Sequence, residues 1–529
     1  MYSTHLTPLM FLERSAYVFR DKTAVVYKDK RFTYKEFCAR VNRMASSLRD
    51  AGIEKGDRVS FICRNTPPLL EAHFGVPLAG ASLVPINIRL SSREISYIVN
   101  HSGSKAFFVD TSFTDLITPI KEELSTVNIY INISKEGMHK KLPGPEYEEF
   151  LSEGSEEHIE IPVEDENEVI TINYTSGTTG LPKGCMYTHR GAYLNAIGEA
   201  LELGMNSDTV YLWTLPMFHC NGWCFTWGAT SMGGTHICLD RVDPLEVYRL
   251  IERERVTHLC AAPVIYIILS EYMKRNKLRL SHKVRMAIAG APPPPAVIMA
   301  MEELGGELIH LYGLTETYGP HTICEWKSEW NKLPIEERAK IKACQGVSYV
   351  GFETKVVDEN MKEMPHDGKT IGEVVMRGNN VMKGYYKEPV RTEKVFVSGW
   401  FHSGDLAVVH PNGYIEIIDR EKDIIISGGE NIASVEVEKI IYEHPDVLEV
   451  AVFSTPDEKW GEAVKALITP KPGTSPTSED IINFCRARMA HFKCPRVVEF
   501  GDIPKTFTGK MMKYILRDRE WKGRKKKVG

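Results

Sequence analysis

The sequence lacks several features that mark specialised classes of protein. Its 11 cysteines include no CxxC pair, and an odd, unpatterned set favours reduced thiols in a cytoplasm over a disulfide framework. Basic residues are not in surplus, because 65 Lys and Arg stand against 70 Asp and Glu, for a net charge of −5. This balance argues against a nucleic-acid binder.

Long apolar runs are also missing. The longest uncharged stretch, residues 209–239, is broken by Pro216, Asn221 and four glycines, which predicts core strand and loop and no membrane span. The N-terminus has no basic segment ahead of an apolar run, so we expect no signal peptide. The final triplet, residues 527–529, does not resemble a peroxisomal address, and we expect a cytoplasmic location.

The composition is that of an ordinary globular protein. Of the 529 residues, 43% are hydrophobic and 26% are charged, and a chain of this length should form two or more domains with a large core. The basic tail, residues 522–529, is expected to be solvated. Nothing in the sequence indicates the oligomeric state, so a homo-oligomer stays open.

Short β-rich runs alternate with helical patterns through most of the chain. For example, residues 34–51 place apolar side chains at helical spacing. Strand–helix alternation over several hundred residues predicts an α/β fold with largely parallel sheets. The segment 135–167, which is acidic and contains Gly and Pro, is expected to be a surface excursion. The runs expected to form buried strands are residues 24–27, 59–63, 106–110, 169–174, 210–215, 286–289 and 308–312.

The pattern changes near Asp419. A strand at 413–418 is followed by the charged DREKD, and from Ala433 onward a smaller α+β pattern appears. Its predicted elements are helices at 435–442 and 479–490 and strands at 450–454 and 463–468. We therefore expect a large N-terminal domain of α/β subdomains over 1–418, a hinge at 419–422 and a small α+β C-terminal domain over 423–529.

Residues 174–184, YTSGTTGLPKG, combine four Ser and Thr hydroxyls, three glycines and Lys183 directly after a predicted strand. Glycines let the backbone approach a ligand closely, and successive N–H groups in such a turn form an anion-binding concavity. The stretch therefore predicts a phosphate-binding loop, although it does not follow the P-loop pattern G-x-x-x-x-G-K-[ST]. Residue chemistry alone also allows a plain Gly/Ser/Thr-rich surface turn.

The whole string resembles the phosphate loop of the adenylate-forming acyl-CoA synthetase superfamily. Four further motifs are similar to that family's, in family order and over essentially the whole chain: AGAPPPP at 289–295, YGLTET at 312–317, SGDL at 403–406 and PKTFTGKMMKY at 504–514. Each motif alone is a weak signal. The ATP-binding residues that the resemblance implies are Thr175, Ser176, Gly177, Thr178, Thr179, Gly180, Lys183, Gly290, Ala291, Pro292, Tyr312, Gly313, Thr315, Asp405, Arg420 and Lys510.

The resemblance also implies the roles of these residues. Thr315 lies near the phosphates, and Glu316 helps to hold Mg²⁺, for which a carboxylate plus substrate phosphates is the usual ligand set. Asp405 binds the ribose hydroxyls beside Arg420, and Lys510 bridges the attacking carboxylate and the α-phosphate. The reaction implied is AMP-forming: a carboxylate and ATP give an acyl-adenylate, which the CoA thiol then converts to a thioester.

In this family the C-terminal domain is mobile and rotates between the two half-reactions. Lys422 falls at the hinge position, where many members have aspartate. Gly428, Gly429 and Glu430 fall where the pantetheine tunnel is expected, because glycines leave room for a narrow thiol arm. The partners expected are a small-molecule carboxylate, ATP and CoA, with no nucleic acid.

PMFHCNGWCFTWG, residues 216–228, resembles the family segment next to the acyl group. Bulky Trp223 would shorten that pocket, which favours a short- or medium-chain acid, including hydroxy and branched acids; aryl acids and longer fatty acids stay open. Cys220 and Cys224 together with His219 also suggest a metal, but no fourth ligand is in view. The acyl-pocket residues that the resemblance implies are His219, which is also a catalytic candidate, Trp223, Val264, Gly290 and Gly313.

Three other functions use the same motifs. A free-standing adenylation enzyme would load the acid onto a carrier protein, a luciferase-like oxidase would need oxygen, and an ATP-binding sensor would have lost catalysis. The intact set of Glu316, Asp405 and Lys510 argues against the sensor.

Overall fold

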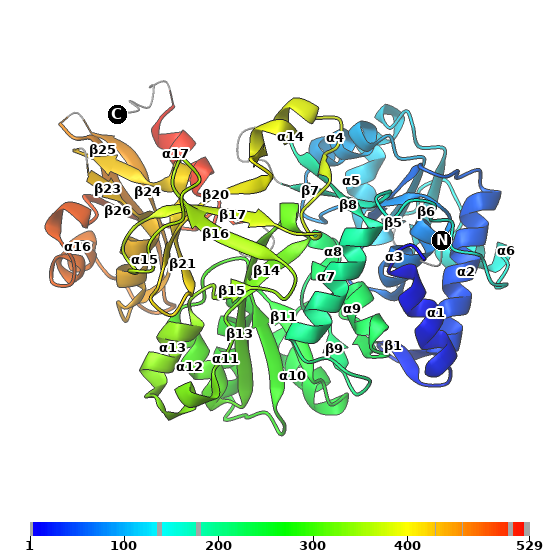
Figure 1. Cartoon of the computed structure of the whole chain (residues 1–529), viewed down its shortest axis with the longest axis horizontal. Coiled ribbons are helices and arrows are strands. Elements are labelled where there is room, and N and C mark those ends of the chain that lie inside the picture. The colour runs from blue at the N-terminus through cyan, green and yellow to red at the C-terminus, as the bar shows by residue number, and fades with distance from the viewer. Residues whose placement is uncertain are drawn as a thin grey trace.

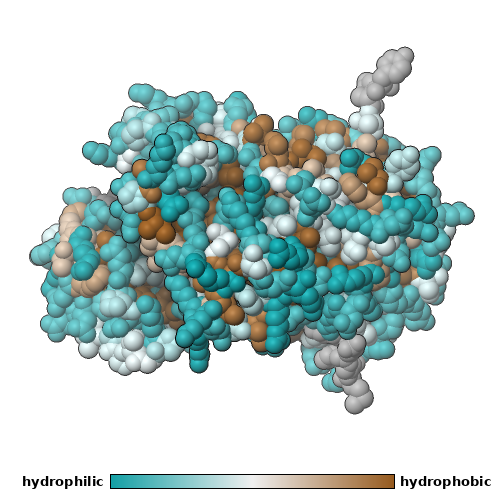
Figure 2. All heavy atoms as spheres, turned by 90° about the horizontal axis from the view of Figure 1, so that it is seen from below, coloured by the Kyte–Doolittle hydropathy of each residue, from teal (hydrophilic) through white to brown (hydrophobic). Residues whose placement is uncertain are grey.

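The computed structural model describes residues 4–134, 140–175, 181–428, 430–457, 459–505 and 511–522. Over these residues the strands form four sheets, and the chain runs from a blue N-terminal part to a red C-terminal part at the opposite side (Figure 1). In the same residues, no helix is long and apolar enough to cross a membrane. The face seen in Figure 2 is largely hydrophilic, with smaller apolar areas between polar side chains.

The largest sheet of the described chain has nine strands. Its central strands are parallel, and antiparallel strands lie at both edges. In spatial order the strands are β15 (Val347–Ser348), β14 (Gly319–Ile323), β13 (Gly306–Leu314), β12 (Val284–Ile288), β11 (His258–Ala261), β9 (Val210–Leu212), β10 (Thr235–Ile237), β1 (Thr23–Tyr27) and β2 (Lys30–Thr33). Helices α10 (Pro244–Arg253), α11 (Pro263–Arg275) and α12 (Pro295–Glu303) bury their apolar faces against this sheet.

A second sheet, of seven strands among the described residues, carries the predicted phosphate loop between two of its strands. In spatial order the strands are β18 (Gly384–Tyr385), β8 (Lys183–Thr188), β7 (Val169–Thr175), β4 (Ser82–Pro85), β3 (Arg58–Ile62), β5 (Ala106–Asp110) and β6 (Ile129–Ile133). The strands β7, β4, β3, β5 and β6 are parallel to one another. Strand β8 pairs antiparallel with β7, and β18 pairs antiparallel with β8. Helices α3 (Pro67–Leu78) and α4 (Ser92–Ser102) follow strands of this sheet.

Helix α2 (Tyr34–Asp50) shows how local sequence sets an element. Thr33 and Glu36 form a reciprocal capping box at its N-terminus, which satisfies N–H groups that otherwise lack partners. The predicted apolar stripe, Phe37, Val41 and Met44 among others, is buried in the main core. The helix begins where the sequence predicted and ends one residue earlier.

The third sheet is antiparallel, unlike the two larger ones. It contains β16 (Glu353–Val357), β17 (Gly372–Arg377), β20 (Trp400–Val409), β19 (Phe396–Val397) and β21 (Ile415–Arg420). Strand β21 ends at Arg420, inside the predicted hinge of residues 419–422. Helices α13 (Ile335–Lys342) and α14 (Pro389–Val395) lie in the same part of the chain.

The C-terminal part has its own sheet and its own core. The strands are β23 (Glu430–Ile432), β22 (Ile425–Ser427), β25 (Gly461–Pro470), β24 (Val447–Asp457) and β26 (Val497–Phe500), and the helices are α15 (Ser434–Tyr442), α16 (Ser478–Arg486) and α17 (Lys513–Glu520). Apolar side chains from β22, β24, β25, α15 and α16 form one buried cluster. A separate α+β C-terminal domain on a large α/β part is therefore confirmed, whereas the boundaries at 418 and 423 stay a prediction.

Two expectations about segments were incomplete. The segment 135–167 contains helix α6 (Tyr147–Glu153), in which Tyr147, Phe150 and Leu151 are buried in the main core, because apolar residues at i, i+3 and i+4 share one helix face. The stretch 209–239 holds the short helices α8 (Cys220–Trp223) and α9 (Phe225–Ser231) besides strand and loop.

Helix α7 (His189–Glu202) buries an acid, Glu199. The Tyr349 hydroxyl donates to Oε2 of Glu199 at 2.9 Å, and Oε1 has no partner in the described part of the chain. Burial raises the pKa of Glu199 well above its usual value of 4.5, and the Tyr349 hydrogen bond offsets only part of this. The fold therefore favours the protonated, uncharged form of Glu199.

This buried acid predicts a pH-dependent effect of Glu199→Gln. An acid with a raised pKa in the fold gives its full stability only below its unfolded pKa, and this stability is lost as the pH rises toward the folded pKa. The amide does not titrate, so the variant should gain stability relative to wild type between about pH 5 and about pH 8. Thermal unfolding at both pH values measures this, with exposed Glu271→Gln as the control; a difference in Tm that does not grow with pH would contradict an uncharged Glu199.

Candidate active site

The predicted phosphate loop connects two paired strands. Strands β7 and β8 run antiparallel and bring Thr175 opposite Lys183. The Thr175 hydroxyl oxygen is buried and has no hydrogen-bond partner among the described residues, which leaves it able to donate to a ligand. The other loop residues of the prediction, Ser176, Gly177, Thr178, Thr179 and Gly180, lie outside the described residues.

Lys183 lies between an acid and a phenol. Its Nζ is 3.1 Å from the Tyr385 hydroxyl and 3.8 Å from Oε1 of Glu316, and it stands 4.3 Å from the centroid of the Tyr385 ring. The Tyr385 hydroxyl donates to the same Glu316 oxygen at 2.8 Å. Burial and then the Glu316 charge raise the pKa of Tyr385, so the phenol keeps its proton and stays a donor.

The turn Thr315–Thr317 carries the two predicted phosphate-side residues directly after β13. The Tyr187 hydroxyl of β8 donates to the Thr315 carbonyl at 2.6 Å, and the Tyr187 ring stacks on Tyr318 with a centroid distance of 3.8 Å. The backbone N–H of Met382 donates to the Glu316 carbonyl at 2.8 Å. Contacts from the seven-stranded sheet thus hold this turn at the end of the nine-stranded one.

Three predicted nucleotide residues from two different sheets meet. Asp405 of β20 pairs in register with Arg420 of β21, and Nε of Arg420 is 3.0 Å from Oδ1 of Asp405. The Tyr312 hydroxyl of β13 donates to the other carboxylate oxygen at 2.7 Å. Asp405 is only 4% exposed, and a buried carboxylate needs partners of this kind.

A left-handed turn carries the predicted acyl-pocket segment. Five successive residues from Cys220 to Cys224 have positive φ, a conformation that costs roughly 1–2 kcal/mol for each residue other than glycine. Asn221 anchors the turn, because its N–H donates to Oδ1 of Asn173 at 3.1 Å and its own Oδ1 accepts from the Thr171 hydroxyl at 3.1 Å. Strain of this kind persists only where the surrounding structure over-determines it.

The turn lies between the core and the nucleotide motif. Trp223 is buried and packs against Gly319, where an added Cβ would be 2.9 Å from Trp223 Cδ1. Cys220 Sγ lies 3.6 Å from the Thr315 hydroxyl and 3.8 Å from Nε2 of His219. The structure therefore brings His219 and Trp223 to the same place as Thr315.

The remaining residues predicted for the acyl pocket and for ATP binding differ in their surroundings. Gly290 has φ +87 and open space where a Cβ would point, whereas a Cβ on Gly313 would be 1.9 Å from the Gly319 carbonyl oxygen. Gly313 is thus required by the close approach of two backbone segments. Val264 is half-buried at the start of α11; Ala291 is half-buried and Pro292 exposed in the turn after β12.

The predicted hinge and thiol-side residues lie in the C-terminal part. The carbonyl of Lys422 accepts from Nη1 of Arg517 at 2.8 Å, and burial together with the Arg420 charge lowers the pKa of the Lys422 ammonium to about 8. Gly428 lies in the turn after β22, where its N–H donates to the Trp460 carbonyl at 2.9 Å, and Glu430 is exposed. Gly429 and Lys510 lie outside the described residues.

Sequence reasoning missed Tyr385 and Tyr187. Both belong to strands far from the YGLTET motif in sequence, and no local pattern marks a tyrosine that reaches across to another sheet. The only available signal was the position of Tyr187 on the strand that follows the phosphate loop.

Comparison with known proteins decides the family. A family model described as AMP-binding enzyme matches residues 12–386, and a second, AMP-binding enzyme C-terminal domain, matches residues 436–510. The chain belongs to the family of AMP-binding enzymes. This enzyme is 54% identical over 517 residues to 4-hydroxybutyrate–CoA ligase 2 of Metallosphaera sedula, covering 97% of this chain and 94% of that one. It is 47% identical to an acetate–CoA ligase of Humulus lupulus, again over 97% of this chain and 94% of the relative.

Solved structures agree with this membership. The AMP-binding enzyme superposes on ATP-bound MatB from Rhodopseudomonas palustris with a TM-score of 0.86 at 26% identity, covering 98% of this chain and 99% of the other. An anthranilate CoA ligase in complex with anthranoyl-AMP gives a TM-score of 0.87 at 25% identity, with 98% of both chains covered. The α/β fold predicted from the sequence is therefore confirmed.

The contact among Lys183, Tyr385 and Glu316 leads to a prediction for Tyr385→Phe. The phenylalanine keeps the ring under the ammonium but removes the hydroxyl that orients both charged groups, so carboxylate-dependent pyrophosphate release should fall by about 10-fold, less than the roughly 10²–10³ expected for a donor on the reacting atoms. Tyr386→Phe, on the next residue, is the matched control. Equal rates in both variants would show that the Tyr385 hydroxyl has no positioning role.

Proposed function

We propose that this enzyme is an ATP-dependent, AMP-forming ligase that joins a short-chain carboxylic acid to CoA through an acyl-adenylate. The observation that carries the proposal is that two groups of contacts lie at the end of β13: Lys183 with Glu316, and Tyr312 with Asp405 and Arg420. This arrangement offers a cation for phosphates at one end and an acid for ribose hydroxyls at the other. The CoA ligases among the relatives support the same chemistry.

On the nucleotide side, the enzyme holds ATP by charge and by hydrogen bonds. Lys183 and the hydroxyls of Thr175 and Thr315 face the phosphates, while the Asp405 carboxylate accepts from the ribose hydroxyls once its present partners rearrange. Glu316 fits a magnesium ion, since it is a single, largely buried carboxylate beside the phosphate residues. When bound, Mg²⁺ would neutralise phosphate charge; Glu316 and the substrate oxygens would hold it.

The first half-reaction forms an oxygen–phosphorus bond and breaks another. An acid carboxylate oxygen attacks the α-phosphorus, the bond from that phosphorus to the bridging oxygen breaks, and pyrophosphate leaves. Both reactants are anions, so the residues need to neutralise charge more than to supply a nucleophile. Lys510 is assigned the contact with the carboxylate and the α-phosphate oxygens.

In the second half-reaction the CoA sulfur attacks the acyl carbon. The carbon–sulfur bond forms, the carbon–oxygen bond to the phosphate breaks, AMP leaves and the thiol proton passes to water. His219 contacts Cys220, whose sulfur lies 3.6 Å from the Thr315 hydroxyl, and His219 is assigned to the point where the thiol reaches the acyl group. Gly428, Gly429 and Glu430 are assigned to the pantetheine arm, and Lys422 to the hinge of the mobile C-terminal domain.

The acid is proposed to be short, with 4-hydroxybutyrate, acetate, butyrate and 2-methylpropanoate as the first candidates. Buried Trp223 packs on Gly319 beside the turn that carries Thr315 and Glu316, so its indole fills space that a longer acid would need. Relatives named for 4-hydroxybutyrate, acetate or butyrate, and 2-methylpropanoate support these choices. A cytoplasmic location is part of the proposal, although the names of several relatives include the word peroxisomal.

A panel of acids tests the function and the role of Trp223 together. Pyrophosphate release should occur with short acids, and acyl-CoA should form only when CoA is present. Trp223→Ala should shift preference toward longer acids, each added methylene being accommodated with about 1–3 kcal/mol of recovered binding, whereas Trp326→Ala should not. Pyrophosphate release with no thioester from CoA would favour loading of a carrier protein, and no release with any acid would overturn the ligase.

Lys510→Ala separates the two half-reactions. Loss of the ammonium should lower adenylate formation by about 10²–10³-fold but largely spare thioester formation from a supplied acyl-adenylate. Lys505→Ala, which removes a lysine that pairs with Glu449, serves as the control. Equal losses in both half-reactions would contradict the role assigned to Lys510.

Lys422→Pro tests the hinge. Proline restricts φ, so turnover should fall more than nucleotide binding, whereas Lys422→Asp, the residue of many family members, should keep most of the activity. The comparison requires steady-state turnover and ATP binding measured on both variants. A proline variant with wild-type turnover would rule out a hinge at this position.

A further inference from the structure

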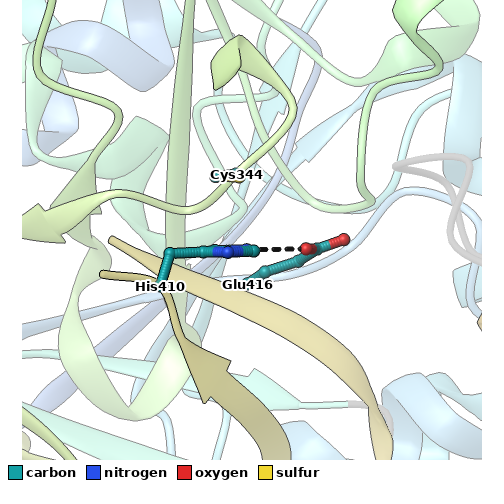
Figure 3. Close-up of side chains that lie close together, drawn as sticks. All are labelled: Cys344, His410 and Glu416. Atoms are coloured by element: carbon teal, nitrogen blue, oxygen red, sulfur yellow. Dashed lines mark hydrogen bonds and ion pairs between the residues drawn. The ribbon is translucent and has the colours of Figure 1, made fainter. Parts of the chain in front are cut away.

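Three side chains with metal-ligand atoms, none of them a candidate active-site residue, cluster at one end of the β20–β21 hairpin. Cys344, His410 and Glu416 place one sulfur, one ring nitrogen and one carboxylate oxygen within 4.8 Å of one another. Figure 3 shows His410 and Glu416 facing each other, with Cys344 on the neighbouring segment. We propose that these residues, called here the hairpin cluster, form a binding site for Zn²⁺.

Rigid backbone holds the hairpin cluster in place. His410 and Glu416 belong to the β20–β21 hairpin, in which the His410 N–H donates to the Tyr414 carbonyl at 2.8 Å and the Gly413 N–H returns to the His410 carbonyl at 2.8 Å. Two hydrogen bonds, at 3.0 and 2.9 Å, join residues 345 and 346 to Ile415. Cys344 and Glu416 are therefore fixed on adjoining backbone segments, as a pre-organised site requires.

The ligand types select the metal. A thiolate, an imidazole and a carboxylate together suit Zn²⁺ and disfavour Mg²⁺ and Ca²⁺, which take oxygen ligands. Three protein ligands occupy three positions of a tetrahedral zinc site, and a water takes the fourth. With Zn–S near about 2.3 Å and Zn–N near about 2.0–2.1 Å, the sulfur needs to approach the other two ligand atoms by about 1 Å, which side-chain rotation of half-exposed Cys344 allows.

The Glu416 carboxylate supplies negative charge for a divalent cation, and the Lys439 ammonium competes for that carboxylate. Nε2 of His410 already contacts Oε2 of Glu416 at 2.9 Å, while Oε1 of Glu416 forms an ion pair with Lys439 of α15. The Lys439 side chain is 51% exposed, so the ammonium can move into water at little cost. Zinc and Lys439 therefore compete for one carboxylate. Zinc binding would break the ion pair that joins Glu416 of β21 to Lys439 of the C-terminal helix α15.

The test is zinc binding by the full chain, without substrates. Calorimetry with Zn²⁺ alone should give one site per chain, and Co²⁺ should produce a thiolate charge-transfer absorption. Loss of even an outer-shell partner costs about 10–100-fold in metal affinity, so Cys344→Ser, His410→Gln and Glu416→Gln should each weaken binding by at least about 10-fold. Cys38→Ser, at the other half-exposed cysteine described in the structure, is the matched control.

Lys439→Ala should change the zinc affinity in the opposite direction, so it distinguishes loss of a ligand from general destabilisation of the protein. Removing the competitor should tighten zinc binding, which a destabilised variant would not do. Affinity that is unchanged or weaker in Lys439→Ala would contradict Glu416 as a ligand, and wild-type affinity in both Cys344→Ser and His410→Gln would overturn the site. Because no substrate is present, these outcomes are independent of the proposed ligase activity.

Discussion

Lys183 is held between the Glu316 carboxylate and the Tyr385 phenol, and this contact joins the two large sheets where the nucleotide is proposed to bind. Lys183 and Tyr385 come from neighbouring strands of the seven-stranded sheet, whereas Glu316 follows β13 of the nine-stranded one. The Lys183 ammonium needs these partners, because an unpaired, largely buried cation is costly. The Tyr187–Thr315 hydrogen bond and the Tyr187–Tyr318 stack reinforce the same junction.

The junction continues into the third sheet and the C-terminal domain. Tyr312, on β13 just before Glu316, donates a hydrogen bond to Asp405. Asp405 in turn forms an ion pair with Arg420 at the end of β21. Next to Arg420, the Asp419 carboxylate accepts from the Ser434 hydroxyl at 2.6 Å, and in the C-terminal domain Lys513 pairs with Glu438 at 2.7 Å. A rotation of the C-terminal domain would therefore act on residues that are one or two contacts from the nucleotide site.

Prediction from sequence succeeded where one local pattern carries the information. The apolar stripe of α2 predicted a helix whose observed end lies within one residue of the prediction. It was less complete for 135–167, where the polar composition hid the buried face of α6, and for 209–239, where no propensity foretells a left-handed turn. Such a turn is unfavourable locally and exists because Asn173, Thr171 and Trp213 surround it.

The sequence by itself determined the family and the α/β fold with a small C-terminal domain, because these follow from short motifs and from periodicities within single elements. It also predicted the residues of the candidate nucleotide site. Only the tertiary structure decided that Tyr385 and Tyr187 join the site, that Gly313 is required by the Gly319 carbonyl, and that Cys344 meets His410 and Glu416. Each of these depends on strands paired across long sequence separations, and the register of such pairing is set by the packing of whole sheets, not by neighbouring residues.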